Sequence, residues 1–166
     1  MVKKIVLLGV FLVVGLGLFG GCRNNRVFSS EDFSLVIEVN GFAVNAGDTI
    51  EVTAILSNIS ERDLRVYFLL PNGINDTNNA IDLGIRPTGI WPETGPVPTW
   101  TLVRARLGSG EALTRTIKHQ FVEILQGSDG EPFCGNYSVL NEVRLFASRN
   151  SEPLVLRIAP ITIRAV

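Results

Sequence analysis

The stretch Ile50-Glu51-Val52-Thr53-Ala54-Ile55-Leu56-Ser57 carries the pattern that decides the fold. Its apolar side chains at even positions alternate with Glu51, Thr53 and Ser57. Successive side chains of a β-strand point to opposite faces, so a period of two predicts a strand with one buried face. The segment is bounded by the turn formers Gly47-Asp48 and Asn58, as expected for a strand in an all-β protein.

Similar strand-like segments recur on both sides of this stretch. They are residues 33–39, with Phe33, Leu35, Ile37 and Val39 on one face, and residues 64–70, 100–107, 112–121, 137–147 and 154–166. No segment has the pattern of an amphipathic helix, and residues 71–98 are expected to form a long insert between strands. Seven or eight strands at this spacing predict an all-β fold, an immunoglobulin-like antiparallel β-sandwich.

Two residues refine this expectation. Tyr137 stands at the start of the penultimate strand, where a tyrosine corner would place its ring in the core and its hydroxyl on the backbone. The alternative is an ordinary strand tyrosine. Pro160 interrupts the last strand, and a proline there marks an edge, a bulge or a switch between sheets.

Four short motifs add a family resemblance. They are Gly47–Val52, Leu56–Ser60, Gly110–Thr114 and Gly135–Val139. Their order resembles that of the bacterial intracellular proteinase inhibitor domain (BsuPI) and of cell-adhesion-related Ig-like modules, over roughly residues 33–147. The resemblance implies a β-sandwich and, as one function, inhibition of a proteinase. The chain departs from it by the 71–98 insert and by its last strand, and no inhibitory residue can be carried over.

The N-terminus has the features of an export signal. Lys3 and Lys4 precede an apolar run over residues 5–19, and Gly20-Gly21-Cys22 follows. This resembles the bacterial lipobox, although Phe19 stands where leucine is usual. The resemblance implies cleavage before Cys22 and lipidation of that cysteine, with palmitate as an expected acyl group. A plain secretory signal cut after Gly20-Gly21 and a retained membrane segment remain alternatives.

These features divide the chain into a signal peptide (1–21), a lipidated N-terminus and tether (22–32) and one Ig-like domain (33–166). The lipid would attach the domain to a membrane of the bacterial cell envelope. Arg23, rather than aspartate, follows the cysteine. The resemblance to lipoproteins of diderm bacteria, which are sorted by this residue, then favours the outer over the inner membrane. The chain has 16 acidic and 15 basic residues. Two of the basic residues, Lys3 and Lys4, lie in the signal, so the part after the signal has a net charge of −3, and nucleic-acid binding is not expected.

The sequence offers little for catalysis. The single histidine, His119, has no nucleophile motif or metal-ligand pattern around it, so it is interpreted as a bonded residue at the rim of a sheet. Cys134 is expected to be a buried free thiol, because Cys22 would carry lipid. Asp76, Asn78 and Asp82 could surround calcium, but they lack the EF-hand pattern and suit turns. We therefore expect no enzyme, no cofactor and no metal.

Recognition is expected in the proline-rich part of the insert. Residues 85–98 contain four prolines, which stiffen a loop, together with Arg86, Trp91 and Glu93 as candidate binding residues. The alternative is that Trp91 folds back onto the sandwich. The sequence thus predicts an envelope lipoprotein that acts as a non-enzymatic binding or structural module towards an unknown envelope protein. The alternative is a proteinase inhibitor that uses an exposed loop.

Overall fold

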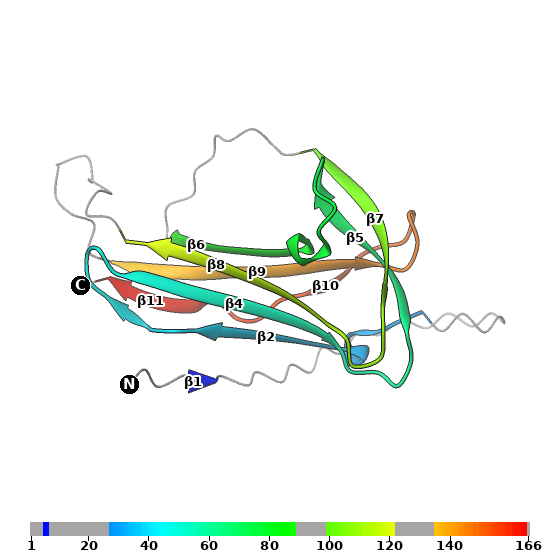
Figure 1. Ribbon diagram of the computed structural model, residues 1–166, viewed down its shortest axis with the longest axis horizontal. Helices are drawn as coiled ribbons and strands as arrows, with labels where there is room; N and C mark the ends of the chain where they lie inside the picture. Colours follow the sequence, from blue (N-terminus) through cyan, green and yellow to red (C-terminus); the bar gives the residue numbers. More distant parts are fainter. Residues whose placement is uncertain (1–4, 7–26, 89–98, 122–134, 166) are drawn as a thin grey trace.

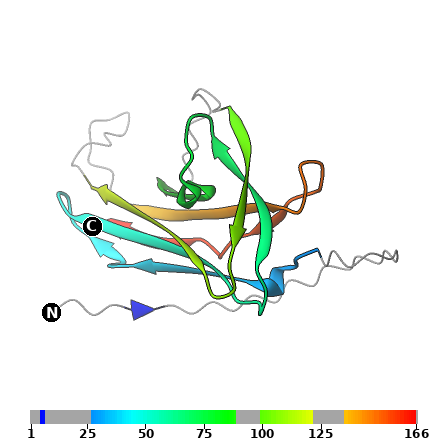
Figure 2. The ribbon, with the colours of Figure 1, turned by 45° about the vertical axis from the view of Figure 1, so that its right-hand side comes forward.

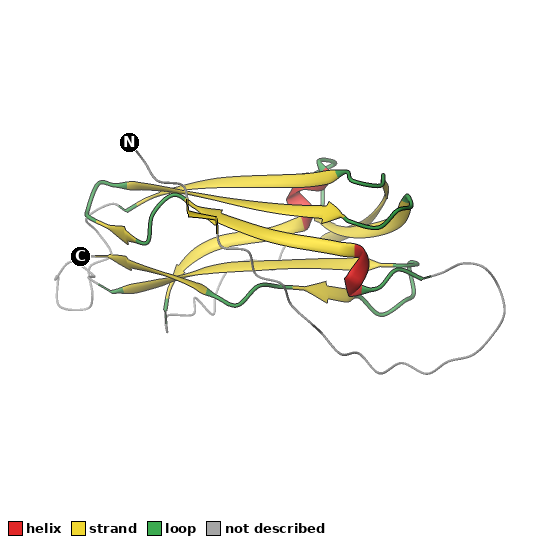
Figure 3. Cartoon of the chain, turned by 90° about the horizontal axis from the view of Figure 1, so that it is seen from below, coloured by secondary structure: helices red, strands yellow, loops and turns green. Residues whose placement is uncertain are grey.

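The predicted β-sandwich is confirmed. The computed structural model describes residues 5–6, 27–88, 99–121 and 135–165, and these form two packed sheets. Figure 3 shows the sheets edge-on as two layers. Two 3-10 helices, η1 (Ser30–Asp32) and η2 (Thr77–Ala80), are the only helices among the described residues, and none of these residues form a helix that could cross a membrane.

The first sheet, sheet A, is entirely antiparallel. Its strands are β1 (Ile5–Val6), β2 (Phe33–Val39), β4 (Thr49–Asn58) and β8 (Ala112–Gln120), in the spatial order β1-β2-β4-β8. The long pairing of β4 with β8 joins segments far apart in the sequence, and β8 forms one edge of the sheet (Figure 1).

The second sheet, sheet B, is built around the long strand β9 (Asn136–Phe146). Its main order is β3-β11-β9-β5-β7, and β6 and β10 also pair with β9. The remaining strands are β3 (Ala43–Val44), β5 (Leu64–Pro71), β6 (Ile81–Pro87), β7 (Trp100–Leu107), β10 (Leu154–Leu156) and β11 (Ile161–Ala165). The short pairing of β11 with β3 is parallel, so the sandwich is not purely antiparallel.

The predicted alternation fixes the core. Each strand expected from its period of two buries the predicted side: Phe33 to Val39 in β2, Ile50 to Leu56 in β4 and Leu64 to Leu70 in β5 all alternate buried and less buried positions. Every buried apolar residue of the described chain lies between Phe33 and Ile163. A chain that starts at Val27 therefore keeps every buried apolar residue of the described chain, although it lacks the short pairing of β1 with β2.

The expected long insert over 71–98 is wrong in its central part. Residues 77–80 form η2, and residues 81–87 form β6, which pairs with β9 from Ile81–Val143 to Pro87–Tyr137. Asp82, Gly84 and Pro87 weaken the strand signal in the sequence because such residues are depleted in strands. Pairing with the long edge of β9 and burial of Ile81 and Leu83 stabilise the strand nevertheless.

The last predicted strand, 154–166, is divided in two. β10 and β11 pair with the same edge of β9 and are separated by residues 157–160, which include Pro160. The buried side chain of Asn141 fills the gap: its Oδ1 accepts from Ile158 N–H at 2.7 Å, and its Nδ2 donates to Ile158 O at 3.3 Å. An amide side chain thus replaces the ladder bonds that the break removes.

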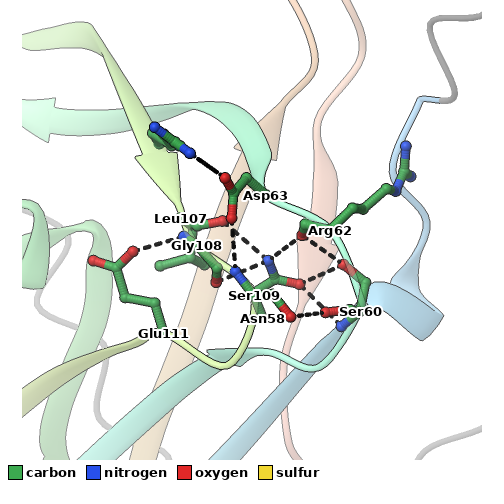
Figure 4. Close-up of polar contacts among 9 residues, drawn as sticks. Asn58, Ser60, Arg62, Asp63, Leu107, Gly108, Ser109 and Glu111 are labelled. Atoms are coloured by element: carbon green, nitrogen blue, oxygen red, sulfur yellow. Dashed lines mark hydrogen bonds and ion pairs between the residues drawn. The ribbon is translucent and has the colours of Figure 1, made fainter.

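At one end of the sandwich, the chain enters beside a network centred on Asn58. Its Nδ2 donates to the carbonyl oxygens of Arg62, Leu107 and Gly108, and its Oδ1 accepts from Ser60 (Figure 4). This fully buried amide fastens the turn before β5 to the turn after β7. Backbone N–H of Ile59 also donates to Asp32 O at 2.9 Å, which attaches η1 to the same end.

The segment assigned to the tether is partly folded. Phe28 packs edge-on against Phe33 with ring centroids 5.5 Å apart, and Asp32 forms an ion pair with Arg62 at 3.5 Å. The part of residues 22–32 that follows Val27 therefore lies against the domain. Cys22 lies outside the described residues.

Candidate functional site

A fork in sheet B forms a pocket among the described residues. β5 pairs with β9 at Tyr67–Phe146 and Phe68–Leu145 and then leaves it, and β6 takes the same edge of β9 from Val143 onward. Figures 1 and 2 show β5 and β7 rising away from the other strands, with the green coil of η2 in the angle between β5 and β6. The divergence leaves a pocket of about 440 Å³, which we call the fork pocket.

The walls of the fork pocket combine apolar and charged groups. It is lined by Leu69, Pro71, Ile74, Asn79, Ala80, Asp82, Trp100, Arg115, Glu142 and Arg144. Trp100 is 45 % exposed and Ile74 is 38 % exposed, which is unusual for such large apolar side chains in one small region. The pocket therefore combines solvent-exposed apolar side chains with charged side chains, which is the usual composition of a ligand site.

The floor of the pocket ties the two sheets together. Arg115 of β8 lies on the inner side of sheet A, and its Nη1 donates to Ile81 O of β6 at 2.5 Å. Next to it, Thr114 N–H donates to Oδ1 of Asn78 in η2 at 2.9 Å. No carboxylate of the described residues forms an ion pair with Arg115, so this half-buried cation keeps unused donors in the pocket.

Glu142 organises the charges at the rim. Its Oε1 accepts from Arg144 Nε, and its Oε2 accepts from Arg157 Nη2, both at 2.6 Å. Asp82 is the Cα partner of Glu142 across the β6–β9 ladder. Like charges in such a position repel, and the two guanidinium groups offset that repulsion.

Arginines cover the outer face of sheet B. Those exposed at outward-facing positions are Arg65, Arg86, Arg104, Arg106, Arg144, Arg157 and Arg164, here called the arginine face. The acidic residues on this face are Asp82, Glu142 and Asp63, which is bonded to Arg106, so seven positive and three negative groups give a formal charge of +4. The whole chain has a formal charge of −1, and the positive charge is therefore concentrated on one face.

Most of the arginine face is not neutralised by neighbours. Among the described residues, no carboxylate pairs with Arg65, Arg86, Arg104 or Arg164. Arg106 pairs with Asp63, and the hydrogen bond from Arg106 is the main reason why the pKa of Asp63 is lowered. The pKa of Arg106 is raised by the same contact.

His119 lies in an aromatic cluster at the end opposite the Asn58 network. Its ring meets Phe121 edge-on with centroids 4.7 Å apart, and Phe121 meets Tyr137 in the same way at 4.8 Å. Burial lowers the pKa of His119. His119 thus lies on the edge strand β8 and packs against rings, while the bond expected from the sequence stays a prediction. Tyr137 is buried at the start of β9, and its hydroxyl bond to the backbone stays a prediction.

The predicted site residues are only partly described. Arg86 lies on β6, exposed and opposite Ser138, and it belongs to the arginine face rather than to the fork pocket. Trp91, Glu93 and Cys134 lie outside the described residues, so the predictions for the 89–98 part of the loop and for the thiol stay predictions.

Two of the residues pictured around calcium, Asp76 and Asn78, lie at η2, and the third lies on a strand. Oδ1 of Asp76 accepts from Asn78 N–H at 3.0 Å and caps η2, while Asn78 bonds to Thr114. Asp82 lies on β6 at the pocket rim. No group of His, Cys, Asp and Glu suited to a metal ion occurs in the described parts of the chain. The turn interpretation agrees with the structure for Asp76 and Asn78, whereas Asp82 is a strand residue.

Sequence reasoning missed the residues that line the fork pocket. Trp100 was assigned to a strand, and Arg115, Glu142 and Arg144 were seen only as strand positions. One signal was available: Arg104, Arg106 and Arg144 occupy the polar phase of alternating strands, so they had to face outward. What the sequence lacked was the pairing that places them on the same sheet.

Comparison with known proteins identifies no family. No family model and no curated protein matches the chain. Among solved structures, it is similar to the alkylpurine DNA glycosylase AlkC of Pseudomonas fluorescens (11 % identity, TM-score 0.42, 81 % of this chain and 30 % of that chain). It is also similar to the β-glucosidase EmGH1 of Erythrobacter marinus (14 % identity, TM-score 0.39, 81 % of this chain and 15 % of that chain).

The chain spans less than a third of either enzyme, and at these identities and TM-scores the activities of those enzymes carry no argument about this chain.

Proposed function

We propose that this chain is a lipid-anchored lipoprotein of the bacterial cell envelope that works as a non-enzymatic binding module through the outer face of sheet B. The observation that supports this most is the fork pocket, where exposed Trp100 and Ile74 adjoin Arg115 and Glu142. Exposed apolar side chains of this size beside charged groups are typical of a binding surface. The packing of His119 in an aromatic cluster fits a role in stability rather than catalysis.

The anchor is tested at Cys22. The Cys22→Ala variant should lose incorporation of labelled fatty acid and should either keep its signal segment or leave the membrane fraction, because the acylated thiol is then absent. Fatty-acid labelling followed by a carbonate wash of the membranes measures this. An alanine variant that is still acylated and still resists the wash contradicts the anchor.

The binding surface is tested by photo-crosslinking from two matched positions. Leu102 on β7 and Ile55 on β4 both point outward from their sheets, and Leu102 is the Cα partner of the pocket residue Leu69. A photoreactive phenylalanine at position 102 should give a discrete adduct in intact envelopes, and the same group at position 55 should not. The Trp100→Ala change should weaken the adduct at 102. Equal adducts at both positions, or none at 102, contradict the proposal.

A further inference from the structure

Three of the five large apolar residues exposed in the described chain lie on the arginine face. The large hydrophobic side chains exposed in the described chain are Val27, Ile59, Ile74, Trp100 and Val155. Val155 is the Cα partner of Arg144, and Ile74 and Trp100 line the fork pocket with it. No such side chain is found on the outer face of sheet A within the described residues. Apolar and cationic groups therefore share one side of the molecule.

The arginine face is long rather than focused. Arg164 lies opposite Asn136 at the start of β9, and Arg65 and Arg106 lie beside its other end, where Tyr67 meets Phe146. The 11 residues of β9 span roughly 35 Å at about 3.3 Å per residue. Guanidinium groups spread over this length match an extended anionic surface better than a single phosphate or carboxylate ligand.

The chain enters the domain near one end of this face. Val27 precedes η1 by three residues, Ile59 N–H donates to Asp32 O of η1, and the turn after Ile59 leads into Leu64 and Arg65 of β5. Five residues, 22–26, separate the predicted lipid attachment from Val27, and they can reach at most about 18 Å. An anchored domain is thus held close enough to the bilayer for one of its faces to touch it.

From these three observations we propose that the arginine face, with Trp100, Ile74 and Val155, binds the surface of a bilayer that contains anionic phospholipid, so that sheet A faces away from the membrane. The inference rests on the proposed function, because it names the bilayer as the partner of the same face. It does not depend on acylation for its test, since the face itself should bind lipid.

The physical basis is a combination of two weak attractions. Each arginine near an anionic membrane strengthens binding by about fivefold through electrostatic attraction. Tryptophan prefers the interface between headgroups and acyl chains, and exposed aliphatic side chains add apolar burial. A soluble polyanion would use the arginines alone and would leave Trp100, Ile74 and Val155 in water.

The test uses the unlipidated chain that starts at Val27, which keeps every buried apolar residue of the described chain. Sedimentation with phosphatidylglycerol–phosphatidylcholine vesicles should show binding that weakens with added salt, and vesicles of phosphatidylcholine alone should bind far less. Two triple variants divide the face. Arg65→Gln, Arg104→Gln and Arg106→Gln remove one end, and Arg86→Gln, Arg157→Gln and Arg164→Gln remove the other. Each should weaken binding by about 100-fold, since three arginines are lost.

The matched control places the same change of net charge on sheet A. Ser34→Glu, Gln120→Glu and Lys118→Gln all lie at outward-facing positions of that sheet. This variant should bind the anionic vesicles within about threefold of the parent, because its charges are a sandwich thickness away and are screened. Urea unfolding of each variant shows whether it is folded. Equal losses in the control and the face variants overturn the proposal.

Trp100 reports contact directly. In a Trp91→Phe background, Trp100 is the single tryptophan, and its emission should shift to the blue when anionic vesicles are added. An unshifted spectrum with bound protein overturns the proposed orientation. Absence of vesicle binding, or binding of heparin without binding of vesicles, overturns the inference as a whole. Either result leaves fatty-acid labelling at Cys22 and crosslinking from position 102 to decide the proposed function separately.

Discussion

The outer faces of the two sheets differ in chemistry although both arise from the same alternation. Sheet A presents mostly Ser, Thr and small apolar side chains, and its charged outward residues are Glu38, Glu51 and Lys118. Lys118 pairs with Glu51 at 3.4 Å, so this face has a formal charge of −1. Sheet B presents the arginine face, with a formal charge of +4 when Asp63, the partner of Arg106, is included.

The alternation of polar and apolar residues does not tell an outer face that only keeps the sheet soluble from one that takes part in recognition, but the difference in charge does. A polar outward phase keeps a strand soluble whatever its charge, and the outer face of sheet A needs no further explanation. An excess of one sign on sheet B raises repulsion within the face and therefore needs a reason. The fork pocket and its exposed apolar residues lie on that same face, which is why we place recognition there.

The largest expected effect is a difference in the free energy of unfolding between substitutions on the inner and the outer side of β9. Tyr137 and Ser138 are neighbours on β9, but Tyr137 is buried and Ser138 faces outward. Tyr137→Ala should lower the free energy of unfolding by about 3–5 kcal/mol, because it leaves a cavity beside Phe121. Ser138→Ala should change it by less than about 0.5 kcal/mol. Urea unfolding of the chain that starts at Val27 measures both.

The Tyr137→Phe variant refines this result. If the hydroxyl makes the corner hydrogen bond expected from the sequence, the loss is about 0.5–1.5 kcal/mol. Equal stability of the parent, the alanine variant and the phenylalanine variant would show that the cluster of Phe121 and Tyr137 does not hold this end of the sandwich.

A smaller effect is expected from the single carboxylate that bridges two arginines. Glu142→Gln releases Arg144 and Arg157 and raises the charge of the arginine face by one, so binding to anionic vesicles should become about fivefold tighter. The matched control is Glu51→Gln, which releases Lys118 on sheet A and should leave binding unchanged.

Stability should fall by less than about 1 kcal/mol in both carboxylate variants, since the ion pairs are exposed. Tighter binding in the Glu51 variant as well would mean that net charge, rather than the face, determines the affinity.

The sequence predicted what depends on local period. The inward residues of β2, β4 and β5 follow from alternation, and β7 begins and ends at the predicted residues, Trp100 and Leu107. β6 could not be predicted in this way, because Gly84 and Pro87 disfavour a strand and only the partner β9 makes it one. Local propensity loses to tertiary pairing at such an element.

The site was less predictable than the fold for a related reason. The period of two shows that Arg65, Arg104 and Arg144 point outward, but not that one face collects them, since that depends on which strands are neighbours. Arg115 stands on the apolar phase of β8, together with Leu113 and Ile117, and the sequence assigned it no role. Its role in the fork pocket depends on the approach of β6 from the other sheet.

The smallest expected effect is a pH dependence of folding stability that vesicle binding by the arginine face does not share. Burial lowers the pKa of His119, so the folded state favours the neutral ring, while the unfolded state takes up a proton near pH 6.5. The contribution of His119 to stability is therefore complete above that pH and is lost as the pH falls from 6.5 through the folded pKa. The arginines keep their charge over this range.

The urea midpoint of the parent should thus be slightly lower at pH 5.5 than at pH 7.5. The difference should be smaller in a His119→Gln variant, which has no ring to protonate. Vesicle binding by the folded domain should be the same at both pH values, because guanidinium groups do not titrate there. An identical fall of the midpoint in both proteins would assign the pH response to other groups. A change in vesicle binding with pH at constant stability would show that groups other than arginine contribute to the face. The difference between the two sheets would then depend on a titratable group of sheet B as well as on its arginines.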